Sequence, residues 1–265
     1  MLRALQGVLG GIEIVAAVIA ILLIVLLPVA IDKYAMCFYT MIGTPSVFLP
    51  LLFEFGCPSP AWMAITALLL HGFVYRIVFM TLFSFQGYYR SLIGGKYNNP
   101  YRWTARGAVY PIYFLIAYHA SGGRDFVTAS VFMIIVFAVE MFRWITERKR
   151  QYNYSRSRQL SVISESGRSA FYASVLFAII VVASQLAYWI IYIAQAPALV
   201  QLMTWIYGIT FLVSYLVFSI WTWIIQGRVE MKYGERMNVE YAWEIFQTIV
   251  LLLLTAFAIL GSVYV

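Results

Sequence analysis

The segment VEYAWEIFQTIVLLLLTAFAILG (Val239–Gly261) is mostly apolar and contains an unbroken run of four leucines, Leu251 to Leu254. A helix needs about 20 apolar residues to cross the roughly 30 Å of hydrocarbon in a bilayer. The apolar residues are continuous rather than alternating, which favours a helix over a strand of a membrane barrel. The segment therefore predicts a membrane-spanning helix.

The whole chain has the same apolar character. Of its 265 residues, 63% are hydrophobic and 11% are charged, whereas a soluble domain is about half apolar and about a quarter charged. We therefore expect a single all-α domain over residues 1–265, an integral multi-pass membrane protein with seven transmembrane helices surrounded by membrane lipids. The predicted spans are Gly7–Ile31, Ala61–Phe85, Tyr101–His119, Asp125–Ile145, Ala170–Ala194, Leu199–Gln226 and Val239–Val263.

Lysine and arginine are divided unevenly between the two ends of these spans. One end holds only Lys33 and Arg124, whereas the basic residues of all the other connecting segments fall at the end that holds the N-terminus. Lys and Arg near span ends collect on the cytoplasmic side of a membrane. We therefore predict that the N-terminus faces the cytoplasm or an equivalent compartment.

The segment Asp32–Pro60 is apolar but is interrupted by glycine and proline, which would leave backbone groups unpaired in lipid. We expect an ordered extracytoplasmic loop or hairpin over residues 32–60, lying over the bundle; an eighth, broken span is the alternative. The two cysteines, Cys37 and Cys57, both fall in this segment, on the side where disulfides persist. Sequence does not show whether their Cα atoms approach, so a disulfide and two free thiols both stay open.

The largest basic cluster lies in the segment 146–169, TERKRQYNYSRSRQLSVISESGRS. We interpret it as a cytoplasmic loop that helps to orient the protein in the membrane. The alternative is a docking surface for anionic lipid headgroups or an acidic partner. A basic loop beside an apolar bundle gives no reason to expect nucleic acid as a partner. The basic residues concerned are Arg148, Lys149, Arg150, Arg156 and Arg158.

Several short stretches follow one another in a recognisable order. They are His71 in the second span, the motif NPYRW at Asn99–Trp103, the pattern G-x-x-D at Gly122–Asp125, and the spacing of Gln226, Glu240 and Gly261. In these features the chain resembles the heliorhodopsins, a family of seven-helix retinal proteins with a cytoplasmic N-terminus. The resemblance covers nearly the whole chain and implies a rhodopsin-like bundle, inverted relative to other rhodopsins, that forms a homodimer.

The chain departs from that family where the photochemistry would occur. Leu251 stands at the position of the retinal-binding lysine, and leucine has no amine with which to form a Schiff base. Ala105 stands where the family has the glutamate counterion. The lysines of the chain all fall in predicted loops: Lys33, Lys96, Lys149 and Lys232. The resemblance therefore implies a retained fold without covalent retinal, with a former pocket lined by His71, Trp103, Gln247 and Leu251.

Ionisable residues remain inside the predicted spans. All of them fall in the cytoplasmic half of the bundle, which is the end that holds the N-terminus. Such groups are costly in hydrocarbon and usually face the bundle interior or water. We expect Arg76 and Arg106 each to contact at least one of the carboxylates, as polar contacts that join helices rather than as a proton path. Glu140 has Arg143 as an alternative partner one turn away. The predicted network consists of Glu13, Arg76, Arg106, Glu140 and Glu244.

No arrangement of residues predicts catalysis or a metal site, and we expect the protein not to be an enzyme. The leading hypothesis is a retinal-free structural or accessory component of a membrane assembly, as a homodimer or as a subunit of a larger complex. One alternative is that the former retinal pocket binds or senses a lipid, sterol or carotenoid. A further alternative is that the acidic and arginine residues form a proton or ion path.

Overall fold

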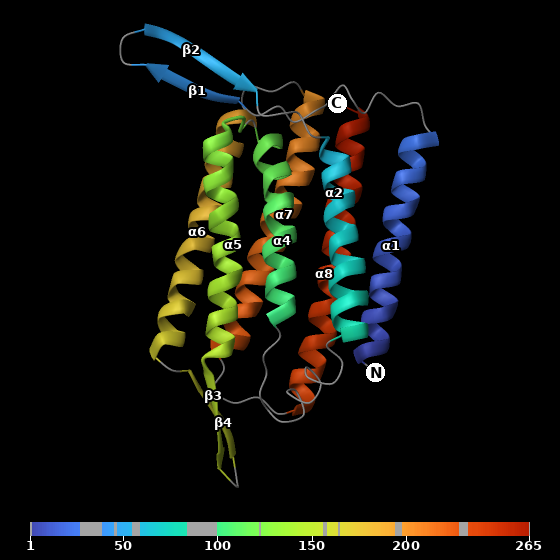
Figure 1. Cartoon of the computed structure of the whole chain (residues 1–265), viewed down its shortest axis with the longest axis vertical. Coiled ribbons are helices and arrows are strands. Elements are labelled where there is room, and N and C mark those ends of the chain that lie inside the picture. The colour runs from blue at the N-terminus through green and yellow to red at the C-terminus, as the bar shows by residue number, and fades with distance from the viewer. Residues whose placement is uncertain are drawn as a thin grey trace.

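The structure is a computed structural model and describes residues 2–26, 39–44, 47–54, 59–83, 100–121, 123–155, 158–163, 165–193, 198–227 and 233–264. These residues form a bundle of roughly parallel and antiparallel helices (Figure 1). N- and C-termini lie at opposite ends of the bundle (Figure 1). The helices are α1 (Leu2–Leu26), α2 (Pro60–Leu69) continued by η2 (Leu70–Phe83), α4 (Pro100–Ala120), α5 (Phe126–Arg148), α6 (Glu165–Ile193), α7 (Ala198–Gly227) and α8 (Tyr233–Tyr264).

Each predicted span falls on a helix, counting α2 and η2 together. Within the described part of the chain, six helices are long and apolar enough to cross a membrane: α1, α2 with η2, α5, α6, α7 and α8. This confirms the prediction of an integral multi-pass membrane protein. Helix ends differ from the predicted ones by a few residues because polar residues extend several helices beyond their apolar cores. In α5, the Asp125 side chain caps the helix by accepting a hydrogen bond from the Thr128 amide at 2.6 Å.

Helix α4, with 21 residues, is shorter than the other long helices, and it is more polar because it carries Arg102, Arg106, Pro111 and His119. It packs against α2, η2, α5, α6 and α7, and most of its residues are buried. Neighbouring helices rather than lipid therefore surround α4. Polar groups inside a membrane protein are tolerated where they face protein, so α4 can carry these residues within the bundle.

The second span changes its helical geometry part of the way along. After α2, the residues of η2 form a π-helix, in which hydrogen bonds join residues five apart. Residues five apart therefore lie on the same side, whereas in an α-helix they are separated by about 140°. His71 and Arg76 are five residues apart, so η2 directs both side chains towards α1 and α8. Sequence periodicity gave no indication of this geometry.

An antiparallel hairpin lies within the predicted segment 32–60. It consists of β1 (Tyr39–Thr44) and β2 (Val47–Glu54), at the end of the bundle opposite the N-terminus (Figure 1). The register shifts between Ile42 and Thr44, opposite the part of β2 that contains Pro50, which has no amide hydrogen to donate. The predicted hairpin is therefore present in this part of the chain. Cys37 and Cys57 lie outside the described residues, so the disulfide stays a prediction.

The basic segment 146–169 is more regular than a loop. Helix α5 extends to Arg148 with Lys149 as its C-cap, and a hairpin of β3 (Arg150–Ser155) and β4 (Arg158–Ile163) follows. Tyrosine, valine and leucine alternate with polar residues along these strands, a pattern that favours strand pairing. The hairpin projects from the end of the bundle that holds the N-terminus (Figure 1). Arg156 lies outside the described residues.

Candidate functional site

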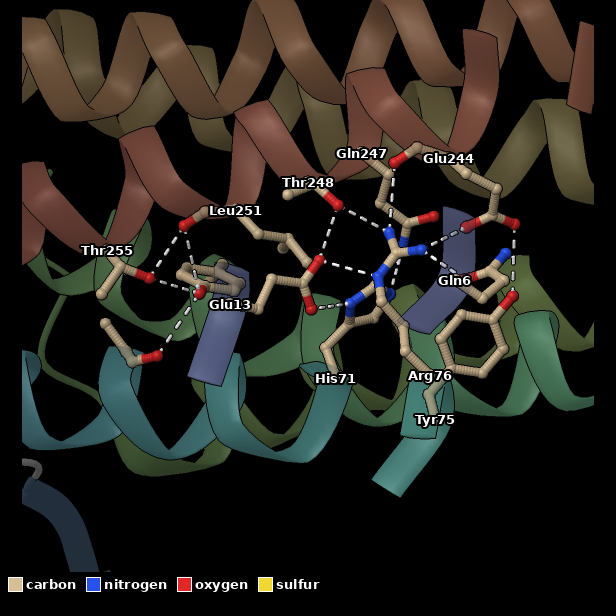
Figure 2. A network of polar contacts seen from close by, with 12 residues as sticks. Gln6, Glu13, His71, Tyr75, Arg76, Glu244, Gln247, Thr248, Leu251 and Thr255 are labelled. Carbon is tan, nitrogen blue, oxygen red and sulfur yellow. Dashed lines mark hydrogen bonds and ion pairs between the residues drawn. The ribbon is translucent and has the colours of Figure 1, made fainter. Parts of the chain in front are cut away.

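Arg76 is the centre of a buried polar network between α1, η2 and α8 (Figure 2). Its Nε donates to Glu13 Oε1 at 2.8 Å, and its Nη1 donates to Glu244 Oε2 at 3.0 Å and to Gln6 Oε1 at 2.5 Å. Its Nη2 donates to the Glu244 carbonyl oxygen at 3.1 Å and to Thr248 Oγ1 at 2.7 Å. An arginine has five N–H donors. Each therefore has an acceptor here, and the guanidinium is saturated.

Glu13, on α1, is equally well supplied with hydrogen-bond donors. Its Oε1 accepts from Arg76 and, at 2.7 Å, from Thr248 Oγ1. Its Oε2 lies 2.8 Å from His71 Nδ1. The other ring nitrogen of His71, Nε2, lies 2.8 Å from Gln247 Nε2 (Figure 2). A histidine that the family resemblance places in the former pocket is thus part of the polar network around Arg76.

Glu244 extends the network from η2 to α4. Its Oε1 accepts a hydrogen bond from the Tyr75 hydroxyl at 3.3 Å and lies 3.4 Å from Arg102 Nη2. Arg102 also forms an ion pair with Glu240. The result is a continuous series of contacts from His71 to Glu240 through α1, η2, α8 and α4, which we call the Arg76 chain. Its members are His71, Glu13, Arg76, Glu244, Arg102 and Glu240.

A second group of ion pairs joins α4, α5 and α7. Arg106 Nε lies 3.1 Å from Glu140 Oε2, and Arg143 Nη1 donates to Glu140 Oε1 at 2.5 Å. Arg143 Nη2 also donates to Ser219 Oγ at 2.5 Å. We call Arg106, Glu140, Arg143 and Ser219 the Arg106 cluster. Glu140 therefore contacts both partners that the sequence suggested, and Arg76 and Arg106 each contact a carboxylate of the predicted set.

Aromatic rings surround the guanidinium of Arg106. Its Cζ lies 4.8 Å from the ring centroids of Tyr110 and Phe218, 5.0 Å from Trp243 and 5.4 Å from Trp103. A cation over an aromatic face is stabilised by the ring quadrupole, most strongly where water is excluded. Arg106 shares the carboxylate of Glu140 with Arg143. Four rings from α4, α7 and α8 thus add to the stabilisation of the Arg106 charge.

Leu251 is fully buried in the core, so this position of the last helix faces the interior of the bundle. On α4, the Tyr113 hydroxyl contacts Thr255 Oγ1 at 2.7 Å and the Leu251 carbonyl oxygen at 3.5 Å. Tyr207, on α7, donates to the Tyr113 carbonyl oxygen at 3.4 Å. Tyrosine side chains and backbone thus pack beside Leu251.

The four residues assigned to the former pocket do not form one lining. His71 and Gln247 contact each other, and Leu251 lies one turn further along α8. Trp103 instead packs edge-on against Trp243 and donates a hydrogen bond to Glu147. Trp243 and Leu251 are about 12 Å apart along the helix axis at 1.5 Å per residue. Ala105, at the expected counterion position, is half-buried, while Arg102 and Arg106 on either side of it are buried.

Several residues of the network were not predicted from the sequence. In the sequence, Arg102 contributes only to the predicted membrane orientation and to the NPYRW motif, and Glu240 only to the spacing that carries the family resemblance. A signal was nevertheless present, because Glu240, Glu244, Thr248 and Leu251 are spaced to lie on one face of a helix. Arg102 and Arg106 are likewise four residues apart. Among the described residues, no group of three or more His, Cys, Asp and Glu side chains could hold a metal ion.

A scan against protein-family models gives no match to this chain, and a search of curated proteins gives no significant match either.

Proposed function

We propose that this chain is a non-catalytic, heliorhodopsin-like membrane protein without covalent retinal, acting as a structural or accessory component of a membrane assembly. The observation that carries the proposal is the complete engagement of Arg76 and Glu13 in the interior. All five N–H donors of Arg76 are matched, and Glu13 accepts from three different side chains. Groups engaged in this way join helices and are not available for reaction with a substrate.

The surroundings of position 251 support the retinal-free part of the proposal. Leu251 offers no amine, and Tyr113 hydrogen-bonds beside it. Lys149 is exposed at the end of α5, and the remaining lysines lie outside the described residues. We expect purified protein mixed with all-trans-retinal and then reduced with borohydride to show no retinyl adduct by intact mass. A stoichiometric adduct would overturn this part of the proposal.

The accessory role is tested by native mass spectrometry of protein extracted with its surrounding lipids. We expect a defined assembly, either a dimer or a complex with a second protein in fixed stoichiometry. Dilution after extraction in a harsher detergent is the control, because it should release the free chain from the same preparation. A monomer with no partner under the gentlest conditions would contradict the proposed role.

A further inference from the structure

One positive charge is shared by two carboxylates in the deepest part of the Arg76 chain. Glu13, Arg76 and Glu244 each have 0% exposed surface. Arg76 donates to both carboxylates, and Arg102, which also reaches Glu244, lies closer to Glu240. An uncompensated charge in a buried site is strongly unfavourable. Glu13 in particular has only a share of one guanidinium.

His71 is placed to supply the additional charge. It too has 0% exposed surface, and its Nδ1 lies 2.8 Å from Glu13 Oε2. The charged and titratable groups around it come from every neighbouring helix. They are Glu13 of α1, Tyr75 and Arg76 of η2, and Glu244 of α8. From α4, Arg102 contacts Glu244, and Tyr113 contacts Thr255 of α8.

Gln247 completes the site on the other side of the imidazole ring. Its amide nitrogen lies 2.8 Å from His71 Nε2, and its Oε1 has no hydrogen-bond partner within the described part of the chain. Rotating the carboxamide by half a turn brings that oxygen to Nε2, where it would accept a second proton from the ring. The same two residues thus accommodate both a neutral and a doubly protonated histidine, with opposite amide orientations.

We propose that His71 is a buried proton-binding site. The imidazolium donates from Nδ1 to Glu13 and from Nε2 to the oxygen of Gln247, and two positive charges then face two carboxylates. Releasing the proton leaves the inner pair of carboxylates with Arg76 alone and turns Gln247 from acceptor to donor. Since Glu13 lies on α1, His71 on η2 and Gln247 on α8, proton binding tightens the contact between these three helices.

Protonating Glu13 instead would disturb more contacts. Both of its oxygens are occupied as acceptors, by Arg76 and Thr248 on one side and by His71 on the other. A proton on Oε1 would replace the hydrogen bond from Arg76 or from Thr248. A proton on Oε2 would point at His71 Nδ1, and the ring would then need its own proton on Nε2, facing Gln247. The ring nitrogen facing Gln247 needs only a rotation of the amide. The geometry therefore favours the histidine as the group that binds the proton.

Nitrogen NMR of the purified, ¹⁵N-histidine-labelled protein in lipid nanodiscs tests the proposal directly. His119 is the only other histidine of the chain, so His119→Gln leaves a single labelled ring. We expect a pH range in which the protein is folded and both nitrogens of His71 carry protons. One protonated and one bare nitrogen throughout the range in which the protein is folded would overturn the proposal. This measurement does not depend on the accessory role, because it reads His71 alone.

A second measurement, of thermal stability against pH, tests whether proton binding tightens the contact between α1, η2 and α8. We expect the thermal midpoint of the wild-type protein to fall by roughly 10 °C as the proton is lost on raising the pH. The pH-dependent step should be absent in His71→Gln. The double variant Glu13→Gln/His71→Gln should be more stable than His71→Gln, because it removes the carboxylate that has lost its partner. An unchanged step in His71→Gln would contradict the proposal. If that variant does not fold, Gln247→Leu, which keeps the ring but removes the second acceptor, should shift the step to lower pH.

Discussion

Arg76 Nη1 lies 3.0 Å from Glu244 Oε2, although 168 residues separate the two positions in the chain. The contact joins η2 to α8, and the same guanidinium joins α1 as well, through Nε to Glu13 and through Nη1 to Gln6. Helices in a membrane gain little from burying apolar surface against each other, because lipid tails are equally apolar. A saturated arginine is therefore an effective way to fix three helices in one arrangement.

Replacing that arginine should be strongly destabilising. We expect Arg76→Gln to lower the free energy of unfolding by about 3–5 kcal/mol, because it leaves two buried carboxylates without their shared partner. Thermal unfolding in detergent, followed by circular dichroism, measures the change. Arg148→Gln is the matched control: Arg148 is exposed at the end of α5, so a cost within about 0.5 kcal/mol is expected. Equal effects of the two substitutions would rule out the structural role assigned to Arg76.

The close approach of α1 and η2 predicts a steric effect at Gly72. A Cβ atom at this position would lie 2.8 Å from Glu13 Cβ and 3.2 Å from Glu13 Oε2. We expect Gly72→Ala to cost about 1–3 kcal/mol through overpacking, measured by the same unfolding assay. Gly11→Ala serves as the control, because an added Cβ there meets nothing within 4 Å. That variant should be neutral or more stable, since alanine favours a helix.

The Arg106 cluster predicts a coupled effect of Glu140 and Arg143. Glu140→Gln should cost about 3–5 kcal/mol because Arg106 and Arg143 share this carboxylate. Arg143→Leu introduced together with Glu140→Gln should cost less than the sum of the single changes, since one of the two cations is then removed. A double-mutant cycle of unfolding free energies measures the coupling. Strict additivity would show that the pair does not interact.

Ion transport offers a test of how the network is used. Because Arg76 and Glu13 are saturated, we expect proteoliposomes to show the same passive proton flux as protein-free liposomes with an imposed pH gradient. A flux that is present in the wild type and lost in Glu13→Gln would favour the proton path instead.

The membrane orientation can be checked from the two ends of the molecule. The N-terminus and the β3–β4 hairpin lie at one end of the bundle, and the C-terminus lies at the other (Figure 1). Since basic residues set topology, we expect an N-terminal reporter to be accessible from the cytoplasm and a C-terminal reporter from the opposite side. The reverse labelling pattern in intact cells would refute the predicted orientation.

Much of the helical framework could be predicted because hydrocarbon imposes a length and a composition on each span. The carboxylate contacts of Arg76 and Arg106 could also be predicted, since charges inside a bundle need partners at similar depth. The position of Trp103 could not, because aromatic residues near a span end suit both the lipid interface and the interior. The π geometry of η2 leaves no pattern in the sequence. His71 therefore could not be placed beside Arg76 on one face.

That geometry links the winding of the second span to the number of residues between His71 and Arg76. His71 and Arg76 reach the same carboxylate only while the backbone between them keeps its wide winding. Ordinary α-helical winding over the same number of residues would separate the two side chains by about 140°, whereas deleting one residue between them would place them four apart, on one face of an α-helix. Natural variants of this segment are accordingly expected to keep the two residues either five apart on a π-helix or four apart on an α-helix.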